Sequence, residues 1–247
     1  MVPYSKLIKA LEDRKSRKKE GLFVIEGPKL LEEALQARLG LKAVLYSESL
    51  KDLNLLEKVP NPIQISEKEL QELSSTVTPQ GIIAVAEIPE YNWTQLRKEP
   101  FFLILDGIQD PGNLGTLFRT ALAAGAGGLV LLKNTVDPFN PKVVRSAMGA
   151  LFKLPFITDV EIETLEGFKG ALWAAMLEEA KPYYELKPQQ GLGLIIGNEG
   201  QGISPEVARL ATERVHIPID TKAESLNAAI AAGVLLFYLR QNLVSLV

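Results

Sequence analysis

The chain has 247 residues, of which 47% are hydrophobic and 23% charged, and its formal net charge at pH 7 is −3. This composition is typical of a globular protein with one large or two small domains, and it excludes a disordered or collagen-like chain. Because there is no cysteine and a single histidine, His216, the sequence excludes disulfide scaffolds, zinc–thiolate and iron–sulfur sites, and metal sites with several histidines. We therefore expect no metal ion.

The sequence also bears on location and on charge distribution. Residues 1–21 lack the continuous apolar stretch of a secretion signal, and the longest apolar run, 226–239, is shorter than the about 20 residues that span a bilayer. We expect a cytoplasmic protein with no membrane partner.

The first 20 residues carry seven Lys or Arg against three Asp or Glu. This run indicates either a solvated helix end or a surface for an anionic partner.

The first 87 residues predict a small α/β unit, because short apolar runs alternate with segments of helical periodicity. The predicted helices are 5–19, 28–39 and 67–74, and the predicted strands are 22–25, 42–46, 63–65 and 82–86. Residues 88–100 contain two prolines and several polar residues between apolar runs, which is typical of a linker. The predicted domains are therefore 1–95 and 96–247.

In the second part of the chain the alternation is clearer. The predicted strands are 101–105, 129–132, 172–176, 192–196 and 215–219, and the predicted helices are 113–124, 141–150, 205–210 and 226–239. Apolar strands joined by helices predict a mostly parallel sheet that is covered on both faces. Ligands of such sheets bind beyond the carboxyl ends of the strands, so we examined the segments that follow each strand.

Three of these segments carry groups suited to chemistry. The first follows residue 105 and reads N-x-G-x-x-x-R from Asn113 to Arg119. If the segment is helical, Gly115 and Arg119 lie on one face, and the glycine permits close approach of a ligand or another backbone. An arginine in this position requires either an anionic ligand or a salt bridge at the surface, and the spacing alone leaves both alternatives open.

The second segment, I-I-G-N-E-G-Q-G over 195–202, ends an apolar strand in a turn with three glycines. Its backbone can bind a flat ligand, or Glu199 can simply cap backbone amides there. The third segment contains a strand with His216 and then E-S-L-N-A-A over 224–229. Its alanines permit close helix packing, and His216 is best explained as a strand residue with a satisfied ring.

In this order, the three segments resemble the SpoU (TrmH-type) branch of the SPOUT RNA methyltransferases. The resemblance rests on N-x-G-x-x-x-R, on I-I-G-N-E-G-x-G, and on I-P-x-x-x-x-x-E-S-L-N with an Ala-rich helix, and it covers roughly residues 101–247. The stretch E-G-L-F-V-I-E-G-P-K over 20–29 and T-P-Q-G-I-I-A over 78–84 resemble the substrate-binding domain of the ribosomal-RNA members. The match is close to full length.

The resemblance implies an α/β fold in which a small N-terminal α/β RNA-binding domain precedes a mostly parallel-sheet SPOUT methyltransferase domain with a C-terminal trefoil knot. It implies transfer of a methyl group from S-adenosylmethionine to a ribose 2′-hydroxyl, by a homodimer in which Arg119 lies near the cofactor of the other subunit. The implied catalytic residues are Asn113, Arg119, Glu199, Ser225 and Asn227. The implied cofactor-binding residues are Ile196, Gly197, Asn198, Gly202, Ile217, Pro218 and Leu226.

The chemistry suits these residue types. A sulfonium methyl group needs neither a metal nor a covalent enzyme intermediate, but a ribose hydroxyl is a poor nucleophile that must be oriented and deprotonated. The resemblance proposes Arg119 as base or as phosphate clamp, and because arginine stays protonated in proteins we favour the clamp.

The resemblance also makes RNA the expected partner, ribosomal RNA above all. The basic residues that we expect to contact it are Arg14, Lys15, Arg17, Lys18, Lys19, Lys29 and Arg145. Arg145 begins R-S-A-M-G-A, which keeps the S-x-G-A segment that lies between the first two motifs of the family.

The sequence also bears on alternative functions. A transfer-RNA 2′-O-methyltransferase and a non-catalytic ribosome-assembly factor of the same fold remain alternatives. A nicotinamide oxidoreductase is disfavoured because the glycine cluster at 125–128 precedes a strand, whereas the dinucleotide fingerprint must follow one. A hydrolase with His216 as its base lacks the G-x-S-x-G turn.

Overall fold

The structure is a computed structural model that describes residues 4–96 and 98–244. The chain divides into two compact units. Unit 1 consists of Met1–Pro89 and Asp137–Lys153, and unit 2 consists of Glu90–Val136 and Leu154–Val247. The long segment Asp137–Lys153 therefore packs with the N-terminal residues, although it lies between two strands of unit 2 in the sequence.

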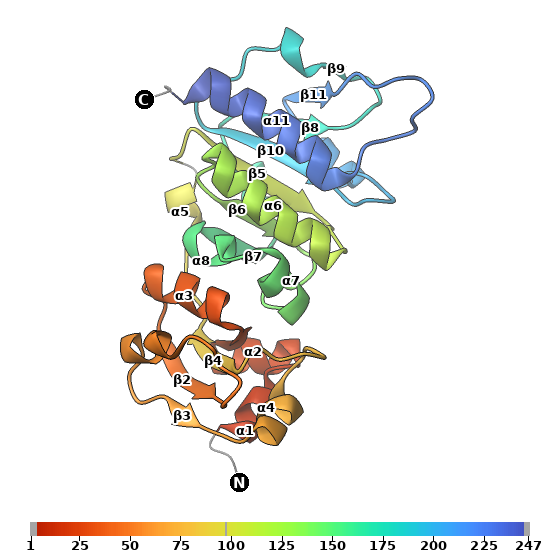
Figure 1. Cartoon of the computed structure of the whole chain (residues 1–247). Coiled ribbons are helices and arrows are strands. Elements are labelled where there is room, and N and C mark those ends of the chain that lie inside the picture. Colours follow the sequence, from red (N-terminus) through yellow and green to blue (C-terminus); the bar gives the residue numbers. More distant parts are fainter. Residues whose placement is uncertain (1–3, 97, 245–247) are drawn as a thin grey trace. The chain divides into compact units, whose positions relative to one another are not determined.

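Unit 1 contains a mixed sheet with strand order β1-β4-β2-β3 (Figure 1). Its strands are β1 (Leu22–Glu26), β2 (Leu41–Tyr46), β3 (Ile63–Gln64) and β4 (Ile82–Glu87). Its helices are α1 (Ser5–Ala10), α2 (Arg14–Glu20), α3 (Pro28–Gln36), η1 (Leu53–Lys58), α4 (Glu67–Leu73), α7 (Pro141–Ser146) and α8 (Ala150–Lys153). Strand β4 pairs antiparallel with both β1 and β2, and β2 pairs parallel with β3.

Two helices that were predicted as continuous are interrupted in unit 1. The segment 5–19 forms α1 and α2, because Asp13 takes an extended conformation and its carboxylate accepts a hydrogen bond from Ser16 N at 2.9 Å, which starts a new helix. The segment 141–150 forms α7 and α8, because Met148 and Gly149 have φ angles of 49° and 86°. A left-handed conformation at two successive residues ends a right-handed helix.

The core of unit 1 lies where α1 and α4 cover the sheet. Ser66 and Glu69 form a reciprocal capping box at the start of α4, which fixes the orientation of the buried Leu70. On β1, the fully buried ring of Phe23 packs against Phe139 and Phe152, with ring centroids 4.8 and 6.0 Å apart. These two contacts bury the segment Asp137–Lys153 against the N-terminal sheet.

Within the described residues, unit 2 contains a seven-stranded sheet in the order β7-β6-β5-β10-β8-β11-β9. Its strands are β5 (Phe101–Asp106), β6 (Leu129–Leu132), β7 (Phe156–Val160), β8 (Leu172–Ala175), β9 (Lys181–Pro182), β10 (Leu192–Gly197) and β11 (Glu213–His216). Its helices are α5 (Trp93–Leu96), α6 (Pro111–Ala124), α9 (Ile162–Glu166), η2 (Tyr183–Glu185), α10 (Pro205–Ala208) and α11 (Ala228–Leu243). Every pair of neighbouring strands is parallel, which confirms the prediction of an α/β fold with a mostly parallel sheet.

The central strands of unit 2 are buried, and helices α6 and α11 lie side by side against them (Figure 1). The sequence did not predict β7 or β9, because β9 is only two residues long and β7 carries polar residues in its second half. The predicted linker 88–100 contains α5, whose Leu96 is buried and whose Trp93 ring packs edge-on against Phe102 and Phe168. It thus contributes to the core of unit 2. No helix among residues 4–96 and 98–244 is both long and apolar enough to cross a membrane.

Candidate active site

The candidate site in unit 2 begins where β5 and β10 end. These strands are parallel neighbours, and Gly197 at the end of β10 pairs with Asp106 at the end of β5. The segments that follow the two strands therefore emerge at the same edge of the sheet, as expected for a ligand site in a parallel α/β fold. They supply two of the three motifs that the sequence singled out.

Helix α6 starts two residues earlier than the sequence predicted. Asp110 is its N-cap and accepts a hydrogen bond from the backbone N–H of Asn113 at 2.7 Å, while Pro111 occupies the first helical position. The signal for this earlier start is in the sequence, because an Asp followed by Pro is typical of a helix N-terminus. The early start places the side chain of Asn113 in the first turn, next to the loop after β10.

Glu199 is held at this point by donors from the β5–α6 segment. Its carboxylate accepts hydrogen bonds from Asn113 Nδ2 at 2.9 Å, from the Gln109 N–H at 3.3 Å and from the Asp110 N–H at 3.4 Å. Partial burial by itself raises the pKa of Glu199, but these hydrogen bonds and its own backbone N–H outweigh that effect and lower the pKa below its usual value. Glu199 is therefore a carboxylate at neutral pH and acts as a hydrogen-bond acceptor.

Asn227 connects the third motif to the first. Its Nδ2 donates to Asn113 Oδ1 at 2.9 Å, and its Oδ1 caps α11 by accepting from the N–H groups of Ala229 and Ile230 at 2.9 and 3.2 Å. Glu199, Asn113 and Asn227 thus form one hydrogen-bonded chain, which we call the amide–carboxylate chain. The structure therefore brings together three of the five predicted catalytic residues, one from each motif.

The other two predicted catalytic residues, Arg119 and Ser225, do not take part in the amide–carboxylate chain. Arg119 is exposed on α6, and no hydrogen bond or ion pair engages its guanidinium within the part of the chain that the structure describes. Ser225 is exposed in the irregular segment before α11. Gly115, which shares the helical spacing of Arg119, is buried in the packing of α6. The guanidinium of Arg119 and the hydroxyl of Ser225 are thus accessible to ligands from outside unit 2.

The predicted cofactor residues at the end of β10 also stabilise the turn that follows this strand. A Cβ atom on Gly197 would lie 2.2 Å from the backbone carbon of Gly202, so only glycine permits the closed turn there. Asn198 and Gly202 exchange two backbone hydrogen bonds of 2.9 Å. The Asn198 side chain donates to the Gly107 carbonyl at 2.7 Å and accepts from two N–H groups of the turn. The side chain of Ile196 is buried.

The remaining predicted cofactor residues lie in the irregular segment 217–227 between β11 and α11. Ile217 is half-buried, whereas Pro218 and Leu226 are exposed. Just before this segment, His216 Nδ1 lies 3.1 Å from the Ala180 carbonyl oxygen, which confirms that the ring of this strand residue has a polar partner. The segment therefore forms an exposed rim at the carboxyl ends of the strands.

Sequence analysis missed a further contact that shapes the site. Both the N–H and the hydroxyl of Ser204 donate to Asp106 Oδ2 at 2.7 Å, which connects the end of β5 to the residue before α10. The position of Asp106 at the end of a strand was the available signal. Among the described residues, no three His, Cys, Asp or Glu side chains are grouped closely enough to hold a metal ion.

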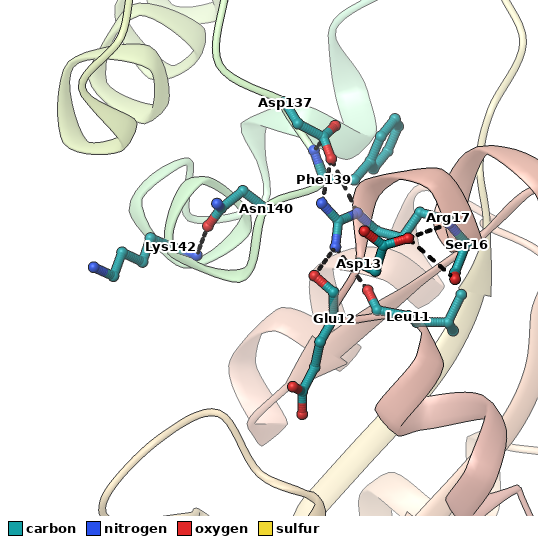
Figure 2. Close-up of polar contacts among 9 residues, drawn as sticks. All are labelled: Leu11, Glu12, Asp13, Ser16, Arg17, Asp137, Phe139, Asn140 and Lys142. Carbon is teal, nitrogen blue, oxygen red and sulfur yellow. Dashed lines mark hydrogen bonds and ion pairs between the residues drawn. The ribbon is translucent and has the colours of Figure 1, made fainter.

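The predicted RNA contacts lie in unit 1. The exposed residues are Arg14, Lys15, Lys18, Lys19 and Lys29, and Arg145 is half-buried. The structure corrects the prediction for Arg17, because only 4% of this residue is exposed. Figure 2 shows its guanidinium donating to Asp137 through Nε and Nη2, and to the Leu11 and Glu12 carbonyls at 2.7 and 2.8 Å. Arg17 therefore stabilises the fold of unit 1, and its guanidinium is not exposed for a contact with RNA phosphates.

Comparison with known proteins agrees with this geometry. The model of the SpoU rRNA Methylase family matches residues 100–237, and the model of the MRM3-like substrate binding domain matches residues 3–84. The chain belongs to the SpoU rRNA methylase family. The resemblance predicted from the motifs is thereby confirmed.

Individual SpoU relatives match almost the whole chain. It is 37% identical over 237 residues to the 23S rRNA (guanosine(2553)-2′-O)-methyltransferase RlmP of Bacillus subtilis, which covers 94% of each chain. It is 30% identical to the human mitochondrial rRNA methyltransferase 3, over 94% of this chain and 70% of the human one. The solved structure of AviRb from Streptomyces viridochromogenes, in complex with the cofactor AdoMet, superimposes with a TM-score of 0.87, covers 99% of each chain and is 27% identical.

Proposed function

We propose that this SpoU family member transfers a methyl group from S-adenosylmethionine to a ribose 2′-hydroxyl of large-subunit ribosomal RNA. The observation that carries the proposal is the amide–carboxylate chain of Glu199, Asn113 and Asn227, which unites all three motifs at the carboxyl edge of the sheet. The named activity of the Bacillus subtilis relative supports the substrate class. A transfer-RNA substrate and a non-catalytic role receive no comparable support.

The segment 217–227 fits the cofactor. Within the described part of the chain, the hydrogen bonds inside 217–226 are those that the Lys222 and Ala223 N–H groups donate to Asp220. Most of its peptide groups are therefore available to the edge of an adenine, while Ile217 and Leu226 offer apolar surface to the ring. Together with the turn 197–202, these residues would hold S-adenosylmethionine.

Glu199, Arg119 and Ser225 have different roles in the proposed reaction. S-adenosylmethionine, when bound, supplies an electrophilic methyl group on a sulfonium centre. Glu199 is already shared among three donors, so it holds Asn113 in place instead of accepting the hydroxyl proton. The accessible guanidinium of Arg119 stays protonated and binds the phosphate beside the target ribose, which orients the 2′-hydroxyl. Ser225 donates a hydrogen bond to the ribose, and a phosphate oxygen or water removes the proton.

A homodimer remains part of the proposal. Helix α11 exposes a row of apolar side chains at helical spacing, Ile230, Val234 and Phe237, which are 58%, 38% and 50% exposed. Exposed apolar rows of this kind typically mark interfaces, and a second subunit is the occupant that the family resemblance implies. Such an interface would bring Arg119 of one subunit toward the cofactor of the other.

Three further features stay predictions of the same proposal. Residues 1–95 would bind the RNA substrate, and residues 96–247 would carry the methyltransferase. A trefoil knot near the C-terminus is implied by the family, and the strand order, in which β10 lies between β5 and β8 and β11 lies between β8 and β9, is consistent with it. A cytoplasmic location is supported by the likeness to a 23S rRNA methyltransferase of a bacterium.

The function is tested with the purified chain, S-adenosylmethionine labelled in its methyl group, and an unmodified 23S ribosomal RNA transcript. We expect roughly micromolar binding of S-adenosylmethionine and none of NADH in calorimetry, followed by labelling of the transcript. A methylated 2′-oxygen blocks alkaline cleavage of the adjacent bond, so the label should remain in an alkali-resistant dinucleotide. Label in mononucleotides would show base methylation instead, and the absence of cofactor binding with transcript present would favour a non-catalytic role.

The four exposed basic residues of α2 are expected to contact RNA phosphates. Replacing Arg14, Lys15, Lys18 and Lys19 by glutamine should reduce the slope of log affinity against log salt concentration by up to about 3, because each phosphate contact on single-stranded RNA contributes about 0.7. The slope is measured by filter binding of the transcript. A control with Lys42, Lys51, Lys58 and Lys68, which are exposed elsewhere in unit 1, removes the same charge. Equal slopes for the two variants would make the α2 run an ordinary solvated surface.

A further inference from the structure

Unit 1 contains a cavity of about 310 Å³ that the proposed reaction does not use. Three stretches of chain line it, one at the end of β1 and start of α3, one before β4, and one at the end of α7. The lining residues are Glu26, Gly27, Lys29, Leu30, Thr76, Thr78, Gln80, Arg145 and Met148. Its volume lies at the lower end of the roughly 300–1,000 Å³ of small-ligand sites, which suits one nucleotide.

The three stretches are short motifs that the sequence analysis noted but did not connect. They are E-G-P-K over 26–29, T-P-Q-G over 78–81 and R-S-A-M-G over 145–149. Gly27 has a φ of 97°, and a Cβ atom there would lie 2.8 Å from Gln80 Oε1, so glycine permits the close contact between the first two motifs. Met148 takes the left-handed conformation that ends α7 and turns its partly exposed side chain to the cavity.

At the cavity wall, hydrogen bonds connect Arg145 to Glu26 through Ser75. Arg145 Nη1 donates to Ser75 Oγ at 2.7 Å, and Ser75 donates through its backbone N–H and its hydroxyl to Glu26. The same carboxylate accepts from the hydroxyls of Ser74 and Thr76. The oxygens of Glu26 are thus occupied within the protein, although its negative charge remains. With one acidic and two basic side chains, Glu26, Lys29 and Arg145, the cavity wall carries a net charge of +1, which favours an anionic ligand.

We propose that this cavity receives one unstacked nucleotide of the substrate RNA. Its phosphate would contact Lys29 and Arg145, since a guanidinium fork matches phosphate oxygens. Its base would pack against Leu30 and the polarizable thioether of Met148, with its polar edge toward Gln80. Sequence-specific RNA recognition targets unpaired bases in this manner. The inference rests on the proposed function, because it makes the nucleotide part of the RNA to be methylated.

The test compares two tryptophan variants of neighbouring residues in the full chain. Thr78 lines the cavity, whereas Val77 is 94% exposed and does not line it. In filter binding of an unmodified 23S transcript, Thr78→Trp should weaken affinity about 10–100-fold, the effect of losing one seated base. Val77→Trp should stay within twofold of the wild type. Because Thr78→Trp would also displace the phosphate from Lys29 and Arg145, the salt slope should fall by about 0.7 in this variant and stay unchanged in Val77→Trp. The affinity for S-adenosylmethionine should be unaffected in both variants.

A second variant keeps the proposal open to refutation if Thr78→Trp fails to fold. Arg145→Gln should weaken binding and reduce the salt slope by about 0.7, whereas Lys68→Gln, on the exposed face of α4, should affect neither the affinity nor the specificity for the transcript. Equal affinities of Thr78→Trp and Val77→Trp, with a wild type that binds and methylates, would overturn the cavity assignment alone. A wild type that neither binds nor methylates the transcript would overturn the proposed function as well.

Discussion

Replacing Arg119 by alanine is expected to reduce the rate of methyl transfer by about 100-fold or more, the effect of losing one preorganised charged contact at a reacting centre. The affinity for S-adenosylmethionine should change by no more than a few-fold, because the proposed cofactor contacts lie in 197–202 and 217–227. Lysine at this position should restore only part of the rate, since it keeps the charge but lacks the planar fork that binds two phosphate oxygens. Single-turnover rates with labelled S-adenosylmethionine measure the effect.

Because Arg119 is exposed, its replacement should affect the reaction and leave the folding of unit 2 intact. Its guanidinium is engaged by no hydrogen bond or ion pair among the described residues, so its removal leaves no buried group without a partner and should not unfold unit 2. Lys169→Ala is a suitable control, because Lys169 is exposed just before β8 and therefore lies near the amino ends of the parallel strands, away from the site. An unchanged rate in Arg119→Ala would remove this residue from the mechanism.

The sequence was sufficient to predict on which edge of the sheet the candidate site lies. The carboxyl ends of parallel strands lie at one edge of the sheet, so the segments after the predicted strands were expected at the same edge. That Asn113 and Glu199 are in contact follows from the pairing of β5 with β10, which the sequence did not predict. The exact partners were less predictable. That Asn227 would both cap α11 and donate to Asn113 depends on how α11 packs on α6, which no local pattern specifies.

Long-range packing also explains what the sequence analysis missed in unit 1. The basic run 14–19 has no apolar stripe, so nothing local distinguishes Arg17 from its exposed neighbours. Its partner Asp137 lies 120 residues further along the chain, in a segment that sequence order assigns to the second domain. For the same reason the cavity could not be predicted, because Arg145 and Met148 reach it only once this segment packs on β1.

Breaking the contact between Arg17 and Asp137 is expected to have the largest effect on stability. Both side chains are largely buried, at 5% and 13% exposed, and the guanidinium also satisfies the Leu11 and Glu12 carbonyls (Figure 2). Arg17→Ala removes the donor to the Leu11 and Glu12 carbonyls and leaves the Asp137 carboxylate with the Phe139 N–H but without the guanidinium. Removing one partner of a buried ion pair destabilises a protein by about 3–5 kcal/mol. Exposed Lys15 on the same helix provides the control, and Lys15→Ala should change stability by less than about 0.5 kcal/mol.

The location of the tryptophans makes it possible to assign this loss to one unit. Trp93 and Trp173, the two tryptophans of the chain, both belong to unit 2, so tryptophan fluorescence during urea denaturation reports on unit 2. Native-state hydrogen exchange of the β1 and β4 amides reports on unit 1. At 1.4 kcal/mol per factor of ten, Arg17→Ala should accelerate that exchange by more than about 100-fold. Exchange rates equal to those of Lys15→Ala would show that the buried pair contributes little to the stability of unit 1.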